Sequence, residues 1–420
     1  MNMQTKQNIF LWLLYDFANS IISITFFLYF AQWIVIDKGV SDLQFNLSFT
    51  ISAVLLLFTA PILGAMLDKS LKRITGLRIT TVLTALLYIL CAIAAINNYE
   101  IISLVLFTLG VYTYILSFTF YTPLLNDIAP QNKIGKISGM GVTANYLGQF
   151  AGLIIALPFA TGKWSLFGAA ARVETLLPAI ALFFILSLPM LLLFKEPKKL
   201  LEKVNLKTKI KQTIIQTKDL FKIKSVFFFL LAYFLFNDAI LTAANNFPIF
   251  LEQVWHVSDT SKTYILLGIL ITSAIGGTTG GIIADKYGHK KTLQFILTGW
   301  IFLLPLIGLL TNFTLFIIST TLMGLWFGAT WSVSRSVMSE VSPKGKHNIA
   351  FSYFGIAERA SSLIGPIVWG LVVSSLVSIG SNRYRIATLV ITLFIILGVL
   401  ALKKVKDTKD LDKLPQKSVE

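Results

Sequence analysis

Charged residues and cysteine are both scarce in this sequence. Only 13% of its 420 residues are charged, whereas an ordinary soluble domain carries about a quarter. The one cysteine, Cys91, lies in an apolar run, so neither a disulfide framework nor a thiolate metal site can form within one chain. With 55% hydrophobic residues and a mean hydropathy of +0.75, a chain of this length cannot hide its apolar surface from water. The bilayer must therefore be its solvent.

Motifs for enzyme chemistry are also missing. The sequence holds no GxxxxGK[ST] phosphate-binding loop through which it could hydrolyse ATP. Its three histidines, His256, His289 and His347, fall in predicted loops at scattered positions and do not compose a metal site. No nucleophile and base stand in the arrangement of a hydrolase. We therefore expect no enzymatic activity, no cofactor and no bound metal.

Long apolar runs are what the sequence has in abundance. A membrane-spanning helix needs about 20 predominantly apolar residues, and twelve stretches meet this requirement. They lie near 9–36, 45–67, 76–96, 101–122, 138–160, 174–194, 225–251, 261–284, 291–311, 313–334, 349–377 and 385–402. The runs are too long and continuous for barrel strands, and the first is too long for a signal-peptide core. The predicted fold class is an all-α membrane protein with twelve transmembrane helices.

Basic residues are distributed unevenly between the two sides of the predicted bundle. Of the 36 Lys and Arg residues, 29 fall on the side that holds both termini and 6 on the other side, and Arg359 inside a helix completes the count. The positive-inside rule then places both termini in the cytoplasm, as in a multi-pass protein of a bacterial-type inner membrane. Because topology explains the net charge of +16, we expect no nucleic-acid partner.

A basic segment divides the chain into two halves of six helices each. The expected organisation is an N-terminal bundle at 1–194, a cytoplasmic linker at 195–224, a C-terminal bundle at 225–402 and a cytoplasmic tail at 403–420. The linker is rich in Lys but carries Ile and Leu at helical spacing. An interfacial helix and a solvated linker are therefore both open interpretations.

The two halves repeat one another. Asp16 has a counterpart in Asp238, at a separation of 222 residues. Two further landmarks follow in the same order: Gly64-Ala-Met-Leu-Asp68-Lys69 matches Gly281-Ile-Ile-Ala-Asp285-Lys286 at a separation of 217, and Asp127-Ile-Ala-Pro130 matches Glu340-Val-Ser-Pro343 at 213. The shrinking separations indicate shorter loops between equivalent helices. Two such pseudo-symmetric six-helix bundles are a transporter architecture, with the solute site between them near the midplane.

Short strings in both halves carry a family resemblance. The loop residues Gly281, Asp285, Lys286, Gly288, Lys290 and Lys291 are similar to the glycine-aspartate-basic signature of the major facilitator superfamily. The earlier copy keeps Gly64, Asp68, Lys69, Lys72 and Arg73 but has Leu71 in place of the second glycine. Three further stretches resemble the vacuole-effluxer family related to autophagy: Tyr15-Asp-Phe-Ala-Asn-Ser20, Phe236-Asn-Asp-Ala239, and Ser334-Arg-Ser336 followed by Pro343, Phe354-Gly355, Arg359 and Gly365-Pro366. The resemblance implies the major facilitator fold and suggests export of amino acids.

Ionisable residues inside membrane helices are the first candidates for a functional site, because each costs at least about 2.5–3.5 kcal/mol on insertion scales. Asp16 and Asp238 each begin a polar stripe along one helix face. The family resemblance adds weight to residues around both aspartates. The candidate substrate or proton site comprises Tyr15, Asp16, Asn19, Ser23, Asn237, Asp238, Thr242, Asn245, Glu358 and Arg359.

Two interpretations of the carboxylates are open. Burial favours the neutral form of a carboxylic acid, so Asp16 or Asp238 could take up a proton at one face and release it at the other. Asp238 lies nearer the middle of its helix, and we expect it to be the coupling residue. Alternatively, both aspartates are fixed partners of Arg359 or of helix ends. Glu358 and Arg359 are adjacent and point about 100° apart, so one of them should reach across to another helix.

The two signature loops are predicted to form gates on the cytoplasmic side. The gating residues are Gly64, Asp68, Lys69, Arg73, Gly281, Asp285, Lys286, Gly288, Lys290 and Arg335. Their aspartates could cap or neutralise a neighbouring helix start. By the superfamily's pattern, Asp68 would face the start of the eleventh helix and Asp285 that of the fifth, with Arg335 as the partner of Asp285. The alternative is that the loops only mark topology during insertion.

Together these features predict a secondary transporter that moves a small polar or amphipathic solute by alternating access, with export favoured. Protons are a candidate coupling ion, membrane lipid surrounds the chain, and we expect a monomer. The alternatives are a nutrient importer and a non-transporting receptor or scaffold. Polar stripes inside the membrane argue against a scaffold, which has no need of them.

The charge bias makes a direct prediction about topology. Reporter fusions at Lys163 and Lys209 should give opposite signals, because these lysines lie on loops at opposite sides of the bundle. A reporter that is active only in the cytoplasm should be on at Lys209 and off at Lys163. The same signal at both positions would overturn the topology.

Overall fold

The computed structural model describes residues 3–67, 72–130, 134–196, 220–343 and 347–405. Within these ranges every regular element is a helix. Twelve of the helical segments are long and apolar enough to cross a membrane. The structure therefore confirms the predicted fold class and the number of spans. Most of the predicted linker lies outside the described residues, so the interfacial-helix interpretation is not tested.

The N-terminal half contributes six spans. The first begins as α1 (Met3–Thr25) and continues through two π-helical stretches, η1 (Phe26–Phe30) and η2 (Trp33–Asp37). The others are α2 (Asp42–Leu67), α3 (Arg73–Ile96), α4 (Glu100–Tyr121), α6 (Ile134–Ala160) and α8 (Leu176–Leu193), with the short helices α5 (Leu124–Ile128) and α7 (Ala171–Glu174) between them. No sequence pattern indicated the wider π-helical turns, which are a local departure that often occurs at functional sites.

The C-terminal half contributes the other six. They are α10 (Lys224–Trp255), α11 (Asp259–Tyr287), α12 (His289–Leu309), α13 (Phe313–Val341), the pair α14 (His347–Ala360) and α15 (Gly365–Ser375), and α16 (Asn382–Lys403), with a short 3-10 turn η4 (Val377–Ile379) before α16. Between the halves, α2 packs on α14 and α15, and α6 packs on α11. The interface therefore uses equivalent pairs of helices from the two repeats.

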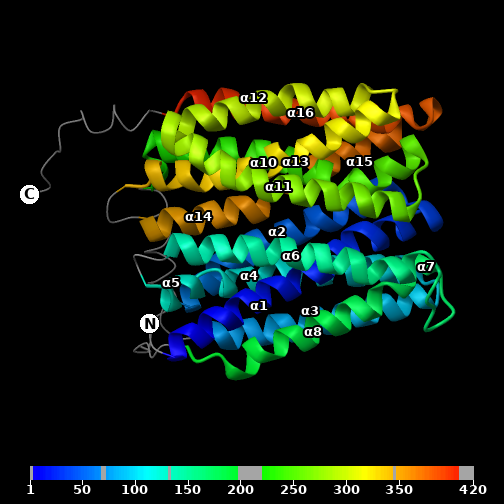
Figure 1. The fold of residues 1–420 in the computed structure, drawn as a ribbon, viewed down its shortest axis with the longest axis horizontal. Coiled ribbons are helices and arrows are strands. Elements are labelled where there is room, and N and C mark those ends of the chain that lie inside the picture. Colours follow the sequence, from blue (N-terminus) through cyan, green and yellow to red (C-terminus); the bar gives the residue numbers. More distant parts are fainter. Residues whose placement is uncertain (1–2, 68–71, 131–133, 197–219, 344–346, 406–420) are drawn as a thin grey trace, which may run out of the picture.

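Both chain ends lie at one end of the bundle. In Figure 1 the helices run along the long axis, with the start of α1 and the end of α16 at the left. We call this end the termini face. The other end, which carries α7, is called the opposite face.

The eleventh span is not one helix. The sequence predicted a single run near 349–377, but α14 ends at Ala360 and α15 begins at Gly365. Pro366 in the first turn of α15 lacks an N–H group and disfavours the helical conformation in the residue before it. The break leaves the first amide groups of α15 without a partner in the helix. An acceptor from another helix must satisfy them.

Small residues allow α11 and α13 to pack closely. A β-carbon at Gly276 would overlap with the carbonyl group of Leu325, and one at Gly328 with the carbonyl group of Ser273. Because lipid tails are as apolar as side chains, close backbone packing of this kind is a main source of helix association in membranes. These two helices are therefore expected to move as one unit.

Neighbouring glycines in α11 provide a matched test of this packing. Gly276→Ala should destabilise the folded protein by about 1–3 kcal/mol, the usual range for overpacking. Gly277→Ala should have little effect, because its β-carbon would lie 3.5 Å from the carbonyl oxygen of Gly328, an ordinary contact. Thermal melting of both variants in detergent checks the difference. Equal melting temperatures would contradict it.

Candidate functional site

The N-terminal part of the candidate site lies on α1. Tyr15 is fully buried, and its hydroxyl lies 2.7 Å from the hydroxyl of Thr81 on α3. Asn19 is also fully buried, and its side-chain amide makes no hydrogen bond within the described residues. Ser23 is half-buried and interacts with Tyr114 of α4. A buried amide without partners is costly, so Asn19 has bonding capacity that a solute or water could use.

Asp16 lies where the two halves approach each other. Its side chain is half-buried and interacts with Asn145 of α6 and Tyr121 of α4. A β-carbon at Gly141 of α6 would lie 3.5 Å from its carboxylate, an ordinary contact, and 2.7 Å from the ring of Trp12, so the Trp12 ring favours a small residue at this position. Arg335 of α13, in the other half, is near enough to attract this carboxylate. Asp16 is therefore a carboxylate within electrostatic range of a cation in the other half.

Asn237 connects three helices of the C-terminal half. Its side-chain oxygen accepts a hydrogen bond of 2.9 Å from the indole N–H of Trp331 on α13. Its amide nitrogen donates to the backbone oxygen of Glu358 on α14, at 3.4 Å. Asn237 is fully buried. These bonds hold α14 beside α10 and fix the ring of Trp331.

Asp238 accepts hydrogen bonds from backbone N–H groups at the break between α14 and α15. Its Oδ2 atom accepts hydrogen bonds from the backbone N–H groups of Gly365, at 2.7 Å, and Ile364, at 3.2 Å. Its Oδ1 atom and the hydroxyl of Thr242 are buried and have no hydrogen-bond partner within the described residues. Asn245, the next residue in the predicted stripe, is half-buried. Of the two open interpretations, this geometry agrees with a fixed partner of a helix end.

Arg359 reaches another helix, as predicted for one of the adjacent charges, and this helix, α4, belongs to the other half. Its guanidinium donates to the backbone oxygen of Phe118, at 3.1 Å, and to the hydroxyl of Thr122, at 2.8 Å. Glu358 instead faces Arg335, with 4.0 Å between the Oε1 and Nη2 atoms and with side chains that are 35% and 44% exposed. Thus Arg359 holds the halves together, whereas Glu358 and Arg335 remain accessible to solvent.

The predicted pair of Asp285 with Arg335 is wrong for this conformation, whereas the predicted contact of Asp285 with the start of the fifth helix falls next to residues 131–133, outside the described ranges. Asp285 is 80% exposed and its carboxylate lies 3.2 Å from His289, four residues away, while Arg335 faces Glu358. The same His289 ring also contacts Glu340, at 3.2 Å. Asp285 lies in the last turn of α11, and its contact His289 is the first residue of α12, the next helix in the chain. The expected Asp285 and Arg335 pair is not formed.

The other predicted gating residues lie near the termini face. In the N-terminal half, Arg73 binds Asp127, and Gly64 lies in the last turn of α2. Asp68 and Lys69 lie outside the described residues. In the C-terminal half, Gly281 packs near Ser332, and Lys286 lies over the ring of Tyr287. Gly288 has a φ of 97°. The ammonium group of Lys290 binds the backbone oxygen of Val405. The positive φ of Gly288 favours glycine and permits the tight turn into α12.

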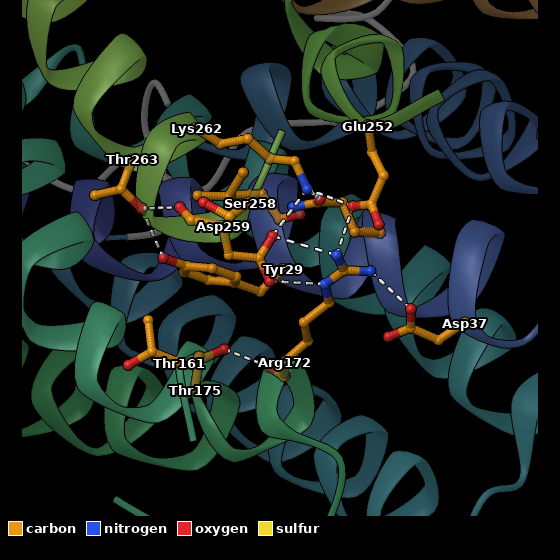
Figure 2. A network of polar contacts seen from close by, with 12 residues as sticks. Tyr29, Asp37, Thr161, Arg172, Thr175, Glu252, Ser258, Asp259, Lys262 and Thr263 are labelled. Atoms are coloured by element: carbon orange, nitrogen blue, oxygen red, sulfur yellow. Dashed lines mark hydrogen bonds and ion pairs between the residues drawn. The ribbon is translucent and has the colours of Figure 1, made fainter. Parts of the chain in front are cut away.

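A cluster of charges at the opposite face was not predicted. Arg172 of α7 binds three carboxylates: Asp37 of the same half at 2.7 Å, and Glu252 and Asp259 of the other half at 2.5 Å and 2.9 Å. Figure 2 shows the guanidinium between the carboxylate of Asp37 on one side and those of the C-terminal half on the other. One cation thus joins η2, α10 and α11.

A second cation completes this opposite-face cluster. Lys262 is fully buried, and its ammonium group binds Glu252, Asp259 and the side-chain oxygen of Gln32. Beside it, the hydroxyls of Tyr29 and Thr263 lie 3.2 Å apart, again across the two halves. A buried ammonium needs its three donors satisfied, and these three acceptors do so. The sequence did hold a signal, because Arg172 and Lys262 are two of the few basic residues on the charge-poor side.

Two further polar contacts between the halves involve α2. Asn46 and Asn246 are buried and exchange side-chain hydrogen bonds of 2.9 Å and 2.8 Å. The hydroxyl of Tyr384 donates to Asp42, at 3.1 Å. The predicted stripe included Asn245 but missed Asn246, which makes the contact. With the charge cluster, these bonds join the two halves at the opposite face.

Comparison with known proteins agrees with this architecture. The profile of the family described as "Vacuole effluxer Atg22 like" matches residues 28–410. The chain is 27% identical over 195 residues to "Autophagy-related protein 22" of Saccharomyces cerevisiae, a match that covers 43% of this chain and 37% of that protein. The chain therefore matches little more than a third of the length of this curated relative. It is also 23% identical over 388 residues to the "Uncharacterized MFS-type transporter YxiO" of Bacillus subtilis, covering 85% of this chain and 86% of that one.

Solved structures share the fold at low sequence identity. The bacterial homolog to the human lysosomal transporter Spinster, in an inward-facing and unoccupied conformation, has a TM-score of 0.72 at 14% identity and covers 96% of this chain and 98% of its own. The nucleoside transporter NupG has a TM-score of 0.68 at 15% identity and covers 96% and 99%. Because the family profile extends over most of the sequence, the chain belongs to the Atg22-like vacuole effluxer family, and it has the fold of a major facilitator superfamily transporter.

Proposed function

We propose that this protein is a secondary transporter that exports a small polar solute by alternating access, with both termini in the cytoplasm. The observation that carries the proposal is that Asp16 of one half lies within electrostatic range of Arg335 of the other, while a cluster of ion pairs joins the halves at the opposite face. A site that opens to one side at a time needs this combination. The charge bias of the loops supports the orientation.

Amino acids are the proposed class of solute. The carboxylate of Asp16 lies within electrostatic range of the guanidinium of Arg335, which also faces Glu358, and the two groups could receive the ammonium and carboxylate groups of a dipolar molecule. The family description as a vacuole effluxer supports export. The alternative of nutrient import uses the same cycle in the reverse direction, and a scaffold would not need these charges inside the membrane.

Proton coupling is proposed for Asp16 and not for Asp238. The Asp238 carboxylate is bound to the backbone of α15 in its own half, so changing its protonation would disturb the helix break. Asp16 lies at the interface, where its protonation would weaken its attraction to Arg335. A proton that changes an attraction between halves can change the preference for one conformation.

Transport by two matched variants tests the function and the coupling together. Proteoliposomes that hold the protein are given a mixed metabolite pool with and without a pH gradient, and accumulated solutes are identified by mass spectrometry. Asp16→Asn should abolish gradient-driven accumulation but retain exchange, which moves no net proton. Asp238→Asn should lower thermal stability by about 1.5–3 kcal/mol, the value of hydrogen bonds to a charged group, and leave transport per folded molecule intact.

The outcomes separate the hypotheses. If Asp238→Asn loses gradient-driven transport and keeps its stability, the coupling role belongs to Asp238 instead. If wild-type vesicles accumulate and exchange no member of the pool, the proposal of a transporter for such solutes is wrong.

The opposite-face cluster should control which face is open. Removing one partner of a buried charge cluster costs about 3–5 kcal/mol, so Arg172→Gln should raise the population open at the opposite face at least tenfold. Ala156 is buried in an apolar cluster that includes Leu266 and Leu267 of the other half. In a Cys91→Ala background, a cysteine at position 156 reports this opening through its labelling rate with an impermeant maleimide.

Lys38→Gln is the matched control for the cluster. Lys38 lies at the same face, but its partner Glu100, at 3.6 Å, belongs to the same half. Its removal should leave the labelling rate unchanged. Equal labelling of wild type and Arg172→Gln would show that the cluster does not hold this face closed.

A further inference from the structure

The turn between α11 and α12 forms a crevice at the termini face that the transport site does not use. Its volume is about 320 Å³, and it is lined by Ile283, Tyr287, Lys291, Thr292 and Phe295. Tyr287 and Phe295 are exposed and belong to the two membrane-spanning helices that form its walls. The crevice is therefore apolar on the side that faces lipid, and it carries the ammonium group of Lys291 at the end nearest the termini face. Tyrosine at such a level is typical of the membrane interface.

The start of α12 has unpaired donors beside this crevice, which the first-turn residue Lys291 lines. The N–H groups of the first helical turn have no partner within a helix, and no side chain of the described residues caps the α12 start. That turn holds no acidic residue, but it does hold Lys290 and Lys291. Positive side chains are unfavourable at the positive end of a helix dipole. An anion bound there would relieve the repulsion.

The equivalent helix in the other half shows what is missing. The start of α3 is bound by Glu196, whose carboxylate accepts from the backbone N–H groups of Arg73, at 3.2 Å, and Ile74, at 3.0 Å. At α12 the neighbouring carboxylates, Asp285 and Glu340, contact the ring of His289. One repeat therefore supplies its own anion at this position, whereas the described residues of the other repeat do not.

A buried hydroxyl also lacks a partner at this point. Thr292 is only 5% exposed, and its side-chain oxygen makes no hydrogen bond within the described residues although it lines the crevice. Most buried threonines satisfy this hydroxyl. Lys291 is exposed and forms no ion pair with any described residue. A ligand in the crevice could bind both groups at once.

We propose that this crevice binds one anionic phospholipid. Its phosphate diester would accept hydrogen bonds from Lys291, the Thr292 hydroxyl and the first N–H groups of α12, and its acyl chain would lie along Ile283 and Phe295. A free phosphate ion would satisfy only the first set of contacts, whereas the crevice continues along apolar side chains that face the bilayer. Basic pockets between membrane helices at the level of the headgroups have this lipid chemistry. The proposal does not depend on the transported solute.

Lipid retention by the purified full-length protein tests the proposal. The protein is incubated with phosphatidylglycerol or phosphatidylcholine of matched chains, and bound lipid is counted by native mass spectrometry. Wild type should retain more phosphatidylglycerol than phosphatidylcholine. Lys291→Gln should reduce that preference about fivefold, since one basic residue contributes about that much attraction for anionic lipid. Thr292→Val, which keeps the shape but removes the hydroxyl, should reduce it roughly threefold.

Lys72→Gln is the matched control, because it removes the same charge beside the start of α3, which Glu196 already binds. It should retain the lipid like wild type, and an equal loss would show only a general surface attraction. Equal retention of both lipids by wild type would show that the crevice binds lipid through its apolar side chains alone and does not select an anionic headgroup. Displacement of the lipid by millimolar inorganic phosphate would make it a site for free anions. A variant that ends at Val405 is also compared with wild type. If it retains more phosphatidylglycerol, a carboxylate of the removed tail occupies the proposed phosphate position. Each of these four results would overturn the proposal.

Discussion

The absence of water inside the bilayer is the constraint on which this structure depends. Backbone groups and charges within the hydrocarbon region must find partners in the protein itself. Twelve helices meet this demand for nearly all of the backbone. Where a helix is interrupted, before Gly365, a carboxylate from α10 replaces the lost partners. Where charges meet between the halves, at Arg172 and Lys262, each cation has several acceptors.

The polar contacts between the halves are not distributed evenly. At the opposite face Arg172 joins both halves and Lys262 is fully buried. Toward the termini face Arg359 joins the halves, and the nearby charges Asp285, Arg335 and Glu358 contact, of the described residues, only those of their own half and are partly or largely exposed. Side chains that remain in water keep their hydration and lose little when they change partners. Buried charges can separate only if new partners or water replace the old ones. The two faces should therefore open by different routes, one by exchange of partners and the other by hydration of the charge cluster.

Sequence patterns predicted the fold better than the site, and the reason is physical. Span number and class follow from hydropathy and length, which are properties of each segment alone. The break at Ala360 was present in the sequence as Gly365-Pro366 but was hidden by the apolar residues on both sides. The stripe with Asp16 and Asp238 marked the right helices. Its partners could not be found, because they depend on which helices become neighbours.

The opposite-face cluster illustrates the same limit. Arg172 and its three carboxylates are separated by between 80 and 135 residues in the chain, so no local pattern relates them. Each carboxylate lies at the end of a helix, where charged residues are common for reasons of solvation alone. Only the packing of the two halves turns these ordinary end residues into a connected group.

The paired amides of Asn46 and Asn246 have a consequence of a different kind. Each carboxamide donates one hydrogen bond to the other and accepts one from it, and each also donates to a backbone oxygen of its own helix, so the pair carries no net charge. Its strength should therefore be nearly independent of acidity and ionic strength, which both modulate the attraction between ions. While the two halves are in contact at the opposite face, this pair would therefore align them in the same way at any pH or salt concentration. The ions nearby could respond to those conditions without any loss of alignment.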